Sequence, residues 1–384
     1  MDNLIILVVI LIGSALISVV FNRINIPSVL GVILLGVILG PGLLNFVKSS
    51  EIIDMFAEIG LILLMFIAGI ETDFKLLKKY LRPSVIVAIM GIVVPVGVIF
   101  VFDYFFGFPL KENLFISIIF AATSVSISVE VLKTLDYLNN ISAATILGAA
   151  VVDDVIAIFL LSVVTGTFSG NFDLQSLFLM IVMWLIFFGF SYFFIRKMVP
   201  YIDHIAKKIP IDNFDSIIAI SICLVMAIVS HLLKLDVVLG AFIAGIAYSE
   251  LSDHEKVNNS VQVIGYSFFI PVFFVSIGLN ISFASIGRDW FFIFCLTVIA
   301  ILTKLFGAGL GARMSRLSID ESYVIGAGMI SRGEMAIIIA QTGFAAGLIS
   351  KHYYSAIIFT IVLTTLIAPL ILKHAITRKV SKEN

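Results

Sequence analysis

The sequence predicts an all-α membrane protein with about thirteen transmembrane helices. Three observations lead to this fold class. Hydrophobic residues make up 61% of the chain, charged residues only 13%, and the mean hydropathy is +1.17. Apolar runs of about 20 residues, long enough to cross roughly 30 Å of hydrocarbon, recur along the whole length. These runs lack the period-two alternation of barrel strands, so helices are the expected spanning elements.

The apolar runs form two sets of six, joined by a seventh span. The first set is predicted at residues 4–21, 28–46, 52–71, 83–106, 112–134 and 143–167. The joining span and the second set are predicted at residues 175–196, 215–233, 237–249, 261–286, 290–312, 321–347 and 353–373. The first run follows an acidic start without a basic segment or a small-residue cleavage site. We therefore expect it to be a retained span rather than a signal peptide.

Lysine and arginine are distributed unevenly between the two ends of the predicted spans. Seventeen of the 24 follow odd-numbered spans or lie in the C-terminal tail. Five lie on the opposite face: Lys48, Lys111, Lys234, Arg288 and Lys351. Cytoplasmic loops carry the excess of basic residues in membrane proteins. We therefore expect a multi-pass protein of the cell membrane, with its N-terminus outside and its C-terminus in the cytoplasm.

This topology predicts an inverted repeat. The first six spans begin outside, the seventh returns the chain, and the last six repeat the set upside down, as in many secondary transporters. The fifth span of each half contains a segment suited to interrupting a helix. One is the hydroxyl-rich run Ala121–Ser128, and the other is Gly326–Glu334. We therefore expect inverted six-helix repeats with two crossing broken helices.

Two adjacent aspartates, Asp153 and Asp154, lie in the otherwise uncharged run Ile146–Gly166. The run is long enough to span a bilayer, so the pair lies near its middle. One charge there costs roughly 2.5–3.5 kcal/mol on insertion scales, and two neighbouring carboxylates also repel each other. Packing does not account for such a pair, whereas binding of a cation or a proton does.

Lys304, midway along the eleventh span, is the natural partner of one aspartate. Successive helical residues are about 100° apart, so Asp153 and Asp154 point in different directions. One lysine satisfies one carboxylate well. The other carboxylate, facing water, would be a cation ligand when ionised and neutral when protonated. The structural alternative is an ion pair that holds the sixth span to the eleventh.

Residues at the predicted breaks have supporting roles in this interpretation. Arg332 and Glu334 are expected to offset the like dipole ends that two crossing broken helices bring together, in preference to direct cation binding. Carbonyls freed around Thr123 and the hydroxyl of Ser124 supply oxygen ligands, which suit a small hard cation. The residues therefore predict a site for a small hard cation at one of the two aspartates.

Three acidic residues toward the cytoplasmic ends of spans, Glu71, Asp73 and Glu130, have two interpretations. We expect them to be solvated at the interface. The alternative is a funnel that attracts cations to the cytoplasmic mouth of the protein.

Glycine and proline patterns indicate packing and bending. The string Gly307-x-Gly309-x-Gly311 lies in a membrane helix without a preceding strand, so close helix packing explains it better than nucleotide binding. Gly36 and Gly40 form a further packing motif, and Pro271 predicts a kink in the tenth span.

Several classes of function are disfavoured. A net charge of −1 gives no indication of a nucleic-acid partner, and the two cysteines fall in apolar spans, without a disulfide framework or zinc spacing. An intramembrane aspartyl protease needs aspartates from different helices to converge on one water, whereas adjacent aspartates diverge. A channel would show a repeated filter or a pore-lining ring. The aspartate pair with Lys304 also argues against an organic-anion symporter. We expect no enzyme activity, no cofactor and no nucleotide.

Seven segments in order make nearly the whole chain resemble a sodium/proton antiporter. The resemblance is to the second branch of the monovalent cation:proton antiporter superfamily, the NapA-like and Kef-like proteins. The segments that carry it are Gly69–Phe74, Ala122–Ser128, Gly148–Val155, Gly240–Gly245, Pro271–Leu279, Thr303–Ala312 and Ser331–Ala336. Together they are specific, although each alone is not.

The resemblance implies a role for each charged residue of the sixth and eleventh spans. Asp154 matches the aspartate that carries the cation and the proton, and Asp153 matches the aspartate that pairs with the lysine, here Lys304. The resemblance therefore implies Na⁺ at Asp154, with Asp153 as a secondary ligand. Members with this pattern are usually electrogenic, whereas members with asparagine at the first position are usually electroneutral. Relatives specific for K⁺ often carry a cytosolic nucleotide-binding domain. Its absence here favours Na⁺ or Li⁺, with K⁺/H⁺ exchange by the same fold as the alternative.

The resemblance also implies a domain organisation and a homodimer. Residues 1–74 and 212–288 would form the dimerisation scaffold, and residues 83–168 and 289–374 a core that moves like an elevator. Residues 172–211 would be a linker helix, and residues 375–384 a short cytoplasmic tail.

Overall fold

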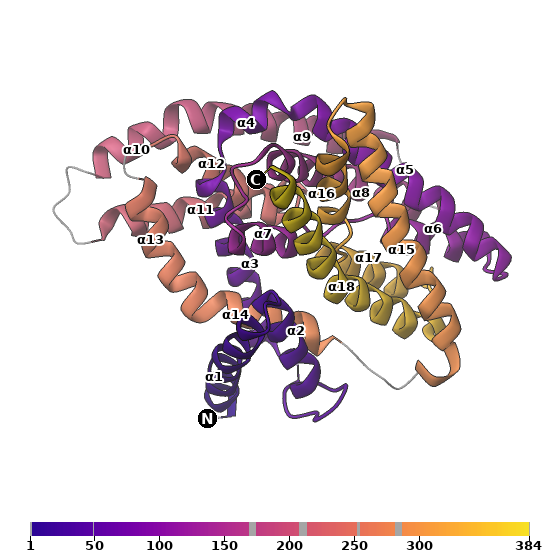
Figure 1. The fold of residues 1–384 in the computed structure, drawn as a ribbon. Coiled ribbons are helices and arrows are strands. Elements are labelled where there is room, and N and C mark those ends of the chain that lie inside the picture. The colour runs from indigo at the N-terminus through magenta and orange to yellow at the C-terminus, as the bar shows by residue number, and fades with distance from the viewer. Residues whose placement is uncertain are drawn as a thin grey trace. The chain divides into compact units, whose positions relative to one another are not determined.

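The computed structural model describes residues 2–48, 50–168, 174–206, 213–251, 254–280 and 286–383, and the regular elements in these ranges are helices (Figure 1). Nine helices of the described residues are long and apolar enough to cross a membrane. The prediction of an all-helical chain with many spans is therefore confirmed. The chain divides into two compact units.

Unit 1 contains the described parts of residues 1–11, 50–78 and 173–273. Its helices α3 and α12 pack closely because Gly69 lies against the backbone of Phe242, and Gly245 against that of Phe66. Its elements are α3 (Glu51–Glu71), α4 (Phe74–Lys79), α9 (Leu174–Phe193), η1 (Phe194–Met198), α10 (Val199–Ala206), α11 (Phe214–Leu232), α12 (Val237–Ser249), α13 (His254–Ile264) and η2 (Gly265–Phe269).

Unit 2 contains the described parts of residues 12–49, 79–172 and 274–384. Helices α1 (Asp2–Arg23) and α14 (Ile270–Leu279) belong partly to each unit. The other elements of unit 2 are α2 (Ser28–Leu39), α5 (Leu81–Phe105), α6 (Leu110–Ile119), α7 (Val125–Thr134), α8 (Ile141–Phe168), α15 (Ile286–Met314), α16 (Ile319–Gly328), α17 (Glu334–Ala345) and α18 (Lys351–Glu383). The predicted division into scaffold and core stays a prediction.

The helices can be compared with the predicted spans at three places. Helix α2 ends at Leu39 rather than near residue 46, because Pro41 disfavours helical backbone at Gly40 before it. The tenth span contains the π-helical segment η2 just before Pro271, which agrees with the expected kink. Helix α18 continues to Glu383, so the described part of the predicted tail is helical.

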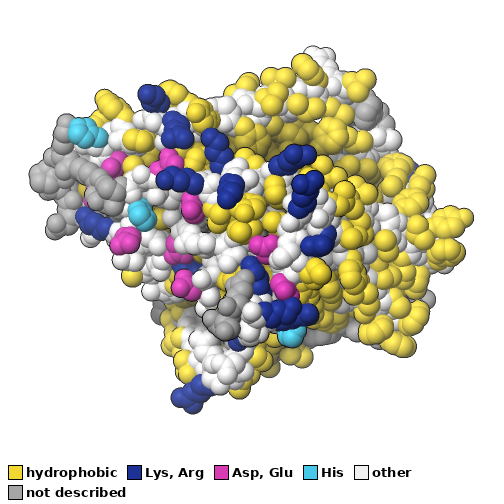
Figure 2. Space-filling view, turned by 45° about the horizontal axis from the view of Figure 1, so that its top comes forward, with side chains coloured by type: hydrophobic (Ala, Val, Ile, Leu, Met, Phe, Trp, Pro, Cys, Tyr) yellow, Lys and Arg dark blue, Asp and Glu magenta, His cyan; other side chains and the backbone are white. Residues whose placement is uncertain are grey.

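Large apolar side chains cover much of the outside of the spanning helices. Leu4, Val8, Ile12 and Leu16 of α1, for example, are each more than half exposed. Figure 2 shows hydrophobic side chains over a broad area beside a region where lysine, arginine and acidic side chains gather. This pattern is typical of a protein whose apolar surface faces lipid.

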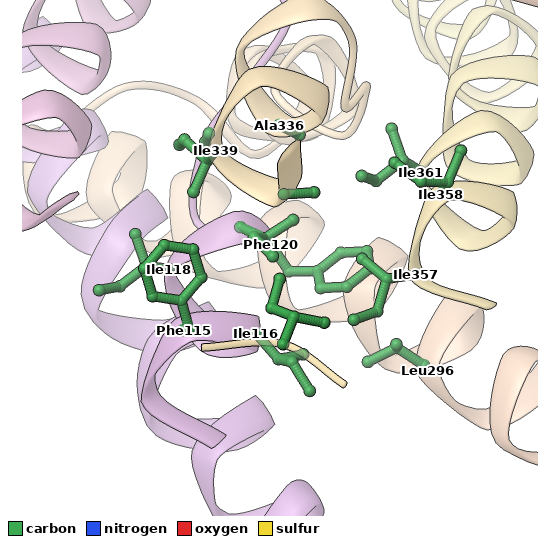
Figure 3. Close-up of a cluster of buried hydrophobic side chains, with 14 of the residues drawn as sticks. Phe115, Ile116, Ile118, Phe120, Leu296, Ala336, Ile339, Ile357, Ile358 and Ile361 are labelled. Atoms are coloured by element: carbon green, nitrogen blue, oxygen red, sulfur yellow. The ribbon is translucent and has the colours of Figure 1, made fainter. Parts of the chain in front are cut away.

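A hydrophobic core of unit 2 lies around the helices α6, α15, α17 and α18. Figure 3 shows Phe115 and Phe120 from the α6 segment beside Ile339 of α17 and Ile357 of α18, all of them fully buried. Helix α15 packs closely against α5 at Gly307, where a Cβ atom would lie only 2.8 Å from the carbonyl oxygen of Met90.

Candidate functional site

The buried ion pair between Lys304 and Asp153 is the centre of the candidate site. Lys304 Nζ of α15 donates a hydrogen bond to Asp153 Oδ1 of α8 over 3.1 Å, and both side chains are 0% exposed. Removing one partner of a fully desolvated ion pair lowers the stability of a protein by several kcal/mol, because the remaining charge is uncompensated. Gly91 of α5 lies next to the lysine, since a Cβ atom there would be in ordinary van der Waals contact with Nζ, at 3.6 Å.

Asp154 follows Asp153 on α8 and is 7% exposed. Its charge acts on Lys304, as does the charge of Asp153, so the two aspartates and the lysine form one electrostatic group. Asp153 Oδ2 has no hydrogen-bond partner among the described residues. The site therefore combines one paired carboxylate with a second carboxyl close by.

Two interrupted helices meet beside this group. The chain leaves helical geometry between α6 and α7 at Phe120–Ser124, and between α16 and α17 at Met329–Gly333. Ser124 N donates to the Ser331 carbonyl over 2.9 Å, and Ser331 Oγ donates to the Ser124 carbonyl over 2.6 Å. The interruptions are thus joined by reciprocal hydrogen bonds, which satisfy backbone groups that the breaks would otherwise leave unpaired.

Small side chains allow this close crossing. Gly333 lies against Ser124, where a Cβ atom would collide with the serine hydroxyl. One turn further along α7, Ser128 Oγ donates to the Gly328 carbonyl at the end of α16 over 2.5 Å. Helix α8, which carries the aspartates, packs against α7, α16 and α17. The aspartates therefore belong to the same packed group as both breaks.

Arg332 lies within the second break and is fully buried. Its Nη2 donates to the carbonyl of Ala300 on α15 over 2.9 Å, and its own carbonyl accepts from Thr365 Oγ1 of α18. Nε and Nη1 have no hydrogen-bond partner among the described residues. The guanidinium also experiences the charge of Asp153. A positive charge held at a helix break is consistent with the predicted offset of dipole ends.

The predicted oxygen ligands lie at the first break. Thr123 is 3% exposed, and its hydroxyl has no hydrogen-bond partner among the residues that the structure describes. Ser124 is fully buried, with its hydroxyl 2.9 Å from that of Ser126. Both residues are thus placed in the packed group, while their role as ligands stays a prediction. The side chain of Glu334 lies outside the described residues.

The three acidic residues proposed for a funnel have different environments. Asp73 is exposed and caps α4, since its Oδ1 accepts the N–H groups of Lys75 and Leu76. Glu71 Oε1 accepts from Asn258 and Gln262 over 2.9 and 2.7 Å. Glu130 is only 8% exposed, so the expectation that it is solvated is wrong. Its helix α7 is enclosed by other parts of unit 2, a burial that the sequence pattern did not indicate.

Two residues of this network were missed by the sequence analysis. Ser331 is next to Arg332, and its small polar side chain could have suggested a link between the breaks. Thr365 lies in an apolar span as one of several hydroxyl residues, and no sequence signal pairs it with Arg332.

A buried lysine–aspartate pair, a second buried carboxyl and two joined helix breaks together define a membrane protein that handles small charged solutes.

Comparison with known proteins identifies the family. Residues 6–378 match the family described as "Sodium/hydrogen exchanger, transmembrane", and the chain belongs to this family. The chain is 44% identical over 379 residues to a "Na(+)/H(+) antiporter" of Enterococcus hirae, with 98% of each chain covered. It is 40% identical over 357 residues to the "Na(+)/H(+)-K(+) antiporter GerN" of Bacillus cereus, covering 93% of this chain and 92% of the relative.

A solved structure has the same fold. The sodium proton antiporter MjNhaP1 from Methanocaldococcus jannaschii aligns with a TM-score of 0.69 at 17% identity, covering 97% of this chain and 96% of that one. The predicted family is confirmed, and with it the prediction of a multi-pass membrane transporter rather than an enzyme.

Proposed function

We propose that this protein exchanges Na⁺ or Li⁺ for protons across the cell membrane. The observation that carries the proposal is the buried Asp153–Lys304 pair with the second carboxyl, Asp154, beside it. A structural ion pair needs only one carboxylate, so the second requires another explanation. Full-length similarity to relatives named as Na⁺/H⁺ antiporters supports the choice of ions.

Asp154 is the proposed exchange site. Ionised, it binds the cation with oxygens of Thr123 and Ser124, and protonated, it is neutral and releases the cation. Because cation and proton compete for one carboxyl, binding one from one side and the other from the opposite side couples the two fluxes. Alternating access would come from an elevator movement of residues 83–168 and 289–374 against the scaffold.

The thirteen-span architecture belongs to the same proposal. The nine long helices, the shorter apolar helices α2 and α12, and the two interrupted helices together give thirteen spans among the described residues. Each interrupted helix is the fifth of its half, as an inverted repeat requires. The uneven distribution of lysine and arginine supports an outside N-terminus and a cytoplasmic C-terminus. A homodimer is proposed on the family resemblance.

We propose that the exchange is electrogenic, because Asp153 and Lys304 supply a second titratable centre next to Asp154.

The test is Na⁺-driven proton flux in proteoliposomes at clamped membrane potential. Asp154→Asn is expected to abolish exchange. Asp153→Asn, the adjacent matched variant, is expected to retain exchange and lose its dependence on potential. Full exchange by Asp154→Asn would refute the assignment.

K⁺/H⁺ exchange is the second candidate, because the relative GerN carries K⁺ in its name. Measuring proton flux driven by Na⁺, Li⁺ and K⁺ in the same vesicles separates the candidates. A flux driven only by K⁺ would replace the proposed selectivity and leave the site unchanged.

A further inference from the structure

Asp103 is a buried carboxyl that the proposed exchange does not use. It lies in the last turn of α5, is 0% exposed, and neither of its carboxylate oxygens has a hydrogen-bond partner among the described residues. An ionised carboxylate in such a place costs several kcal/mol, because neither water nor a donor stabilises the charge. The neutral acid is the form that this environment tolerates.

A second buried carboxyl makes ionisation of Asp103 still less favourable. Glu112 of α6 is 8% exposed, and its Oε1 accepts the N–H of Ser350 over 2.8 Å, just before α18 begins. The negative charge of Glu112 therefore stabilises the start of α18. That charge repels a carboxylate at Asp103. The negative end of the α5 dipole acts in the same direction.

The other elements packed against α5 supply no compensating cation among the described side chains. Helix α8 carries no charged residue after Asp154. Lys111 of α6 lies over the ring of Phe168, 5.6 Å from its centroid. Near this end of α15 the charged side chain that the structure describes is another acid, Asp289, while the side chain of Arg288 lies outside the described residues. Lys304, further along α15, is paired with Asp153.

Apolar groups enclose the same end of α5. The rings of Phe102, Phe106 and Phe108 each contact the ring of Phe292 on α15, and Tyr353 of α18 packs on Phe108 with a centroid distance of 4.5 Å. The nearby amide of Asn113 donates to the Phe100 carbonyl over 2.9 Å.

We propose that Asp103 is a second proton-binding site, separate from Asp153 and Asp154. It holds a proton at neutral pH and releases it when the side of the membrane that carries the α5–α6 turn becomes alkaline. Under the proposed orientation this is the outer side. Release creates two neighbouring anions, and their repulsion acts on Glu112 and its bond to Ser350. Since α18 packs against α15, α16 and α17, the site connects pH on that side to the helices around the exchange site.

Infrared difference spectroscopy of the purified protein tests the proton directly. We expect a carboxylic-acid carbonyl band at neutral pH that Asp103→Asn lacks and that disappears from the unsubstituted protein as pH rises. Glu112→Gln removes the repelling charge and makes ionisation of Asp103 easier, so the band should be lost at lower pH than in the unsubstituted protein. Loss of the band at the same pH in both proteins would contradict the repulsion. Identical spectra for the protein and Asp103→Asn would overturn the proposal. This measurement does not depend on ion exchange, so it remains valid if the proposed function fails.

Exchange in proteoliposomes tests the connection to transport. With pH varied on one side at a time, alkaline pH at the α5–α6 side should alter the rate of the unsubstituted protein and leave Asp103→Asn unaffected. Glu51→Gln, which changes an exposed acid at the start of α3, is the control and should behave as the unsubstituted protein. Equal pH profiles with and without Asp103 would overturn the connection, even with the infrared band present.

Discussion

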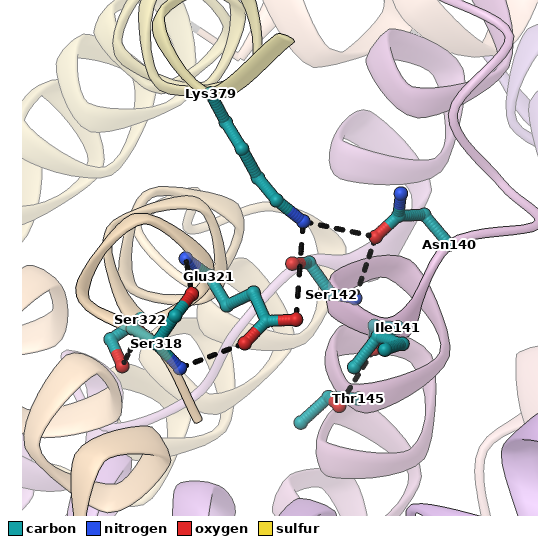
Figure 4. Close-up of polar contacts among 8 residues, drawn as sticks. All are labelled: Asn140, Ile141, Ser142, Thr145, Ser318, Glu321, Ser322 and Lys379. Atoms are coloured by element: carbon teal, nitrogen blue, oxygen red, sulfur yellow. Dashed lines mark hydrogen bonds and ion pairs between the residues drawn. The ribbon is translucent and has the colours of Figure 1, made fainter. Parts of the chain in front are cut away.

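Two sets of ion pairs in unit 2 use the same residue types in different surroundings. Lys304 and Asp153 are both 0% exposed within the packed helices. At the end of α18, Lys379 contacts Glu321 in the first turn of α16 (Figure 4). Lys382 contacts Asp320 in the same turn. Lys382 is 50% exposed there, and its partner Asp320 28%. Burial thus separates the central pair from the pair of Lys382 and Asp320, which water and salt weaken.

The pairs at the end of α18 are embedded in a local polar network. Glu321 accepts from Ser318 N over 2.8 Å in a capping box that begins α16, and its other oxygen is 4.0 Å from Lys379 Nζ. Lys379 Nζ is also 3.5 Å from Asn140 Oδ1, beside the start of α8. Figure 4 shows these residues converging from three segments. The network holds helix ends together, whereas the central pair leaves a second carboxyl next to it.

The largest expected effect breaks the central pair. Lys304→Ala leaves Asp153 buried without its cation and should lower the free energy of unfolding by about 3–5 kcal/mol. Thermal unfolding in detergent measures the loss. Lys304→Ala combined with Asp153→Ala should recover part of it, because no charge is then left unpaired. Lys382→Ala is the matched control, and an equal loss in that variant would contradict the comparison.

A smaller effect is expected where the two breaks cross. Gly333→Ala places a methyl group against the hydroxyl of Ser124 and should cost about 1–3 kcal/mol by overpacking. Because the crossing adjoins the aspartates, the exchange rate should also fall. Gly97→Ala in α5 is the control, since nothing lies within 4 Å of the added carbon. Unchanged stability and exchange in Gly333→Ala would show that the crossing tolerates separation.

The sequence predicted the features that follow from local composition. Apolar runs located the helices. The pairing of a lysine with an aspartate was predictable because each lies in an apolar span, where a single unpaired charge is too costly. The hydrogen bonds between Ser124 and Ser331 were not predictable, since two segments about 200 residues apart must first fold together. The burial of Glu130 depends on tertiary packing in the same way. The two breaks themselves were visible, because hydroxyl and glycine residues interrupt otherwise apolar helices.

The smallest expected effect is at the exposed pair of Lys382 and Asp320. Their hydrogen bond of 2.6 Å lowers the pKa of Asp320 below its ordinary value of 3.8. The contribution to stability is therefore fully present above about pH 4 and is lost as pH falls through the lowered pKa. Lys382→Ala should show a slight loss of thermal stability at neutral pH that disappears in strong acid and shrinks in high salt. A loss that persisted at high salt would mean that the aliphatic stem of Lys382, rather than its charge, stabilises the contact.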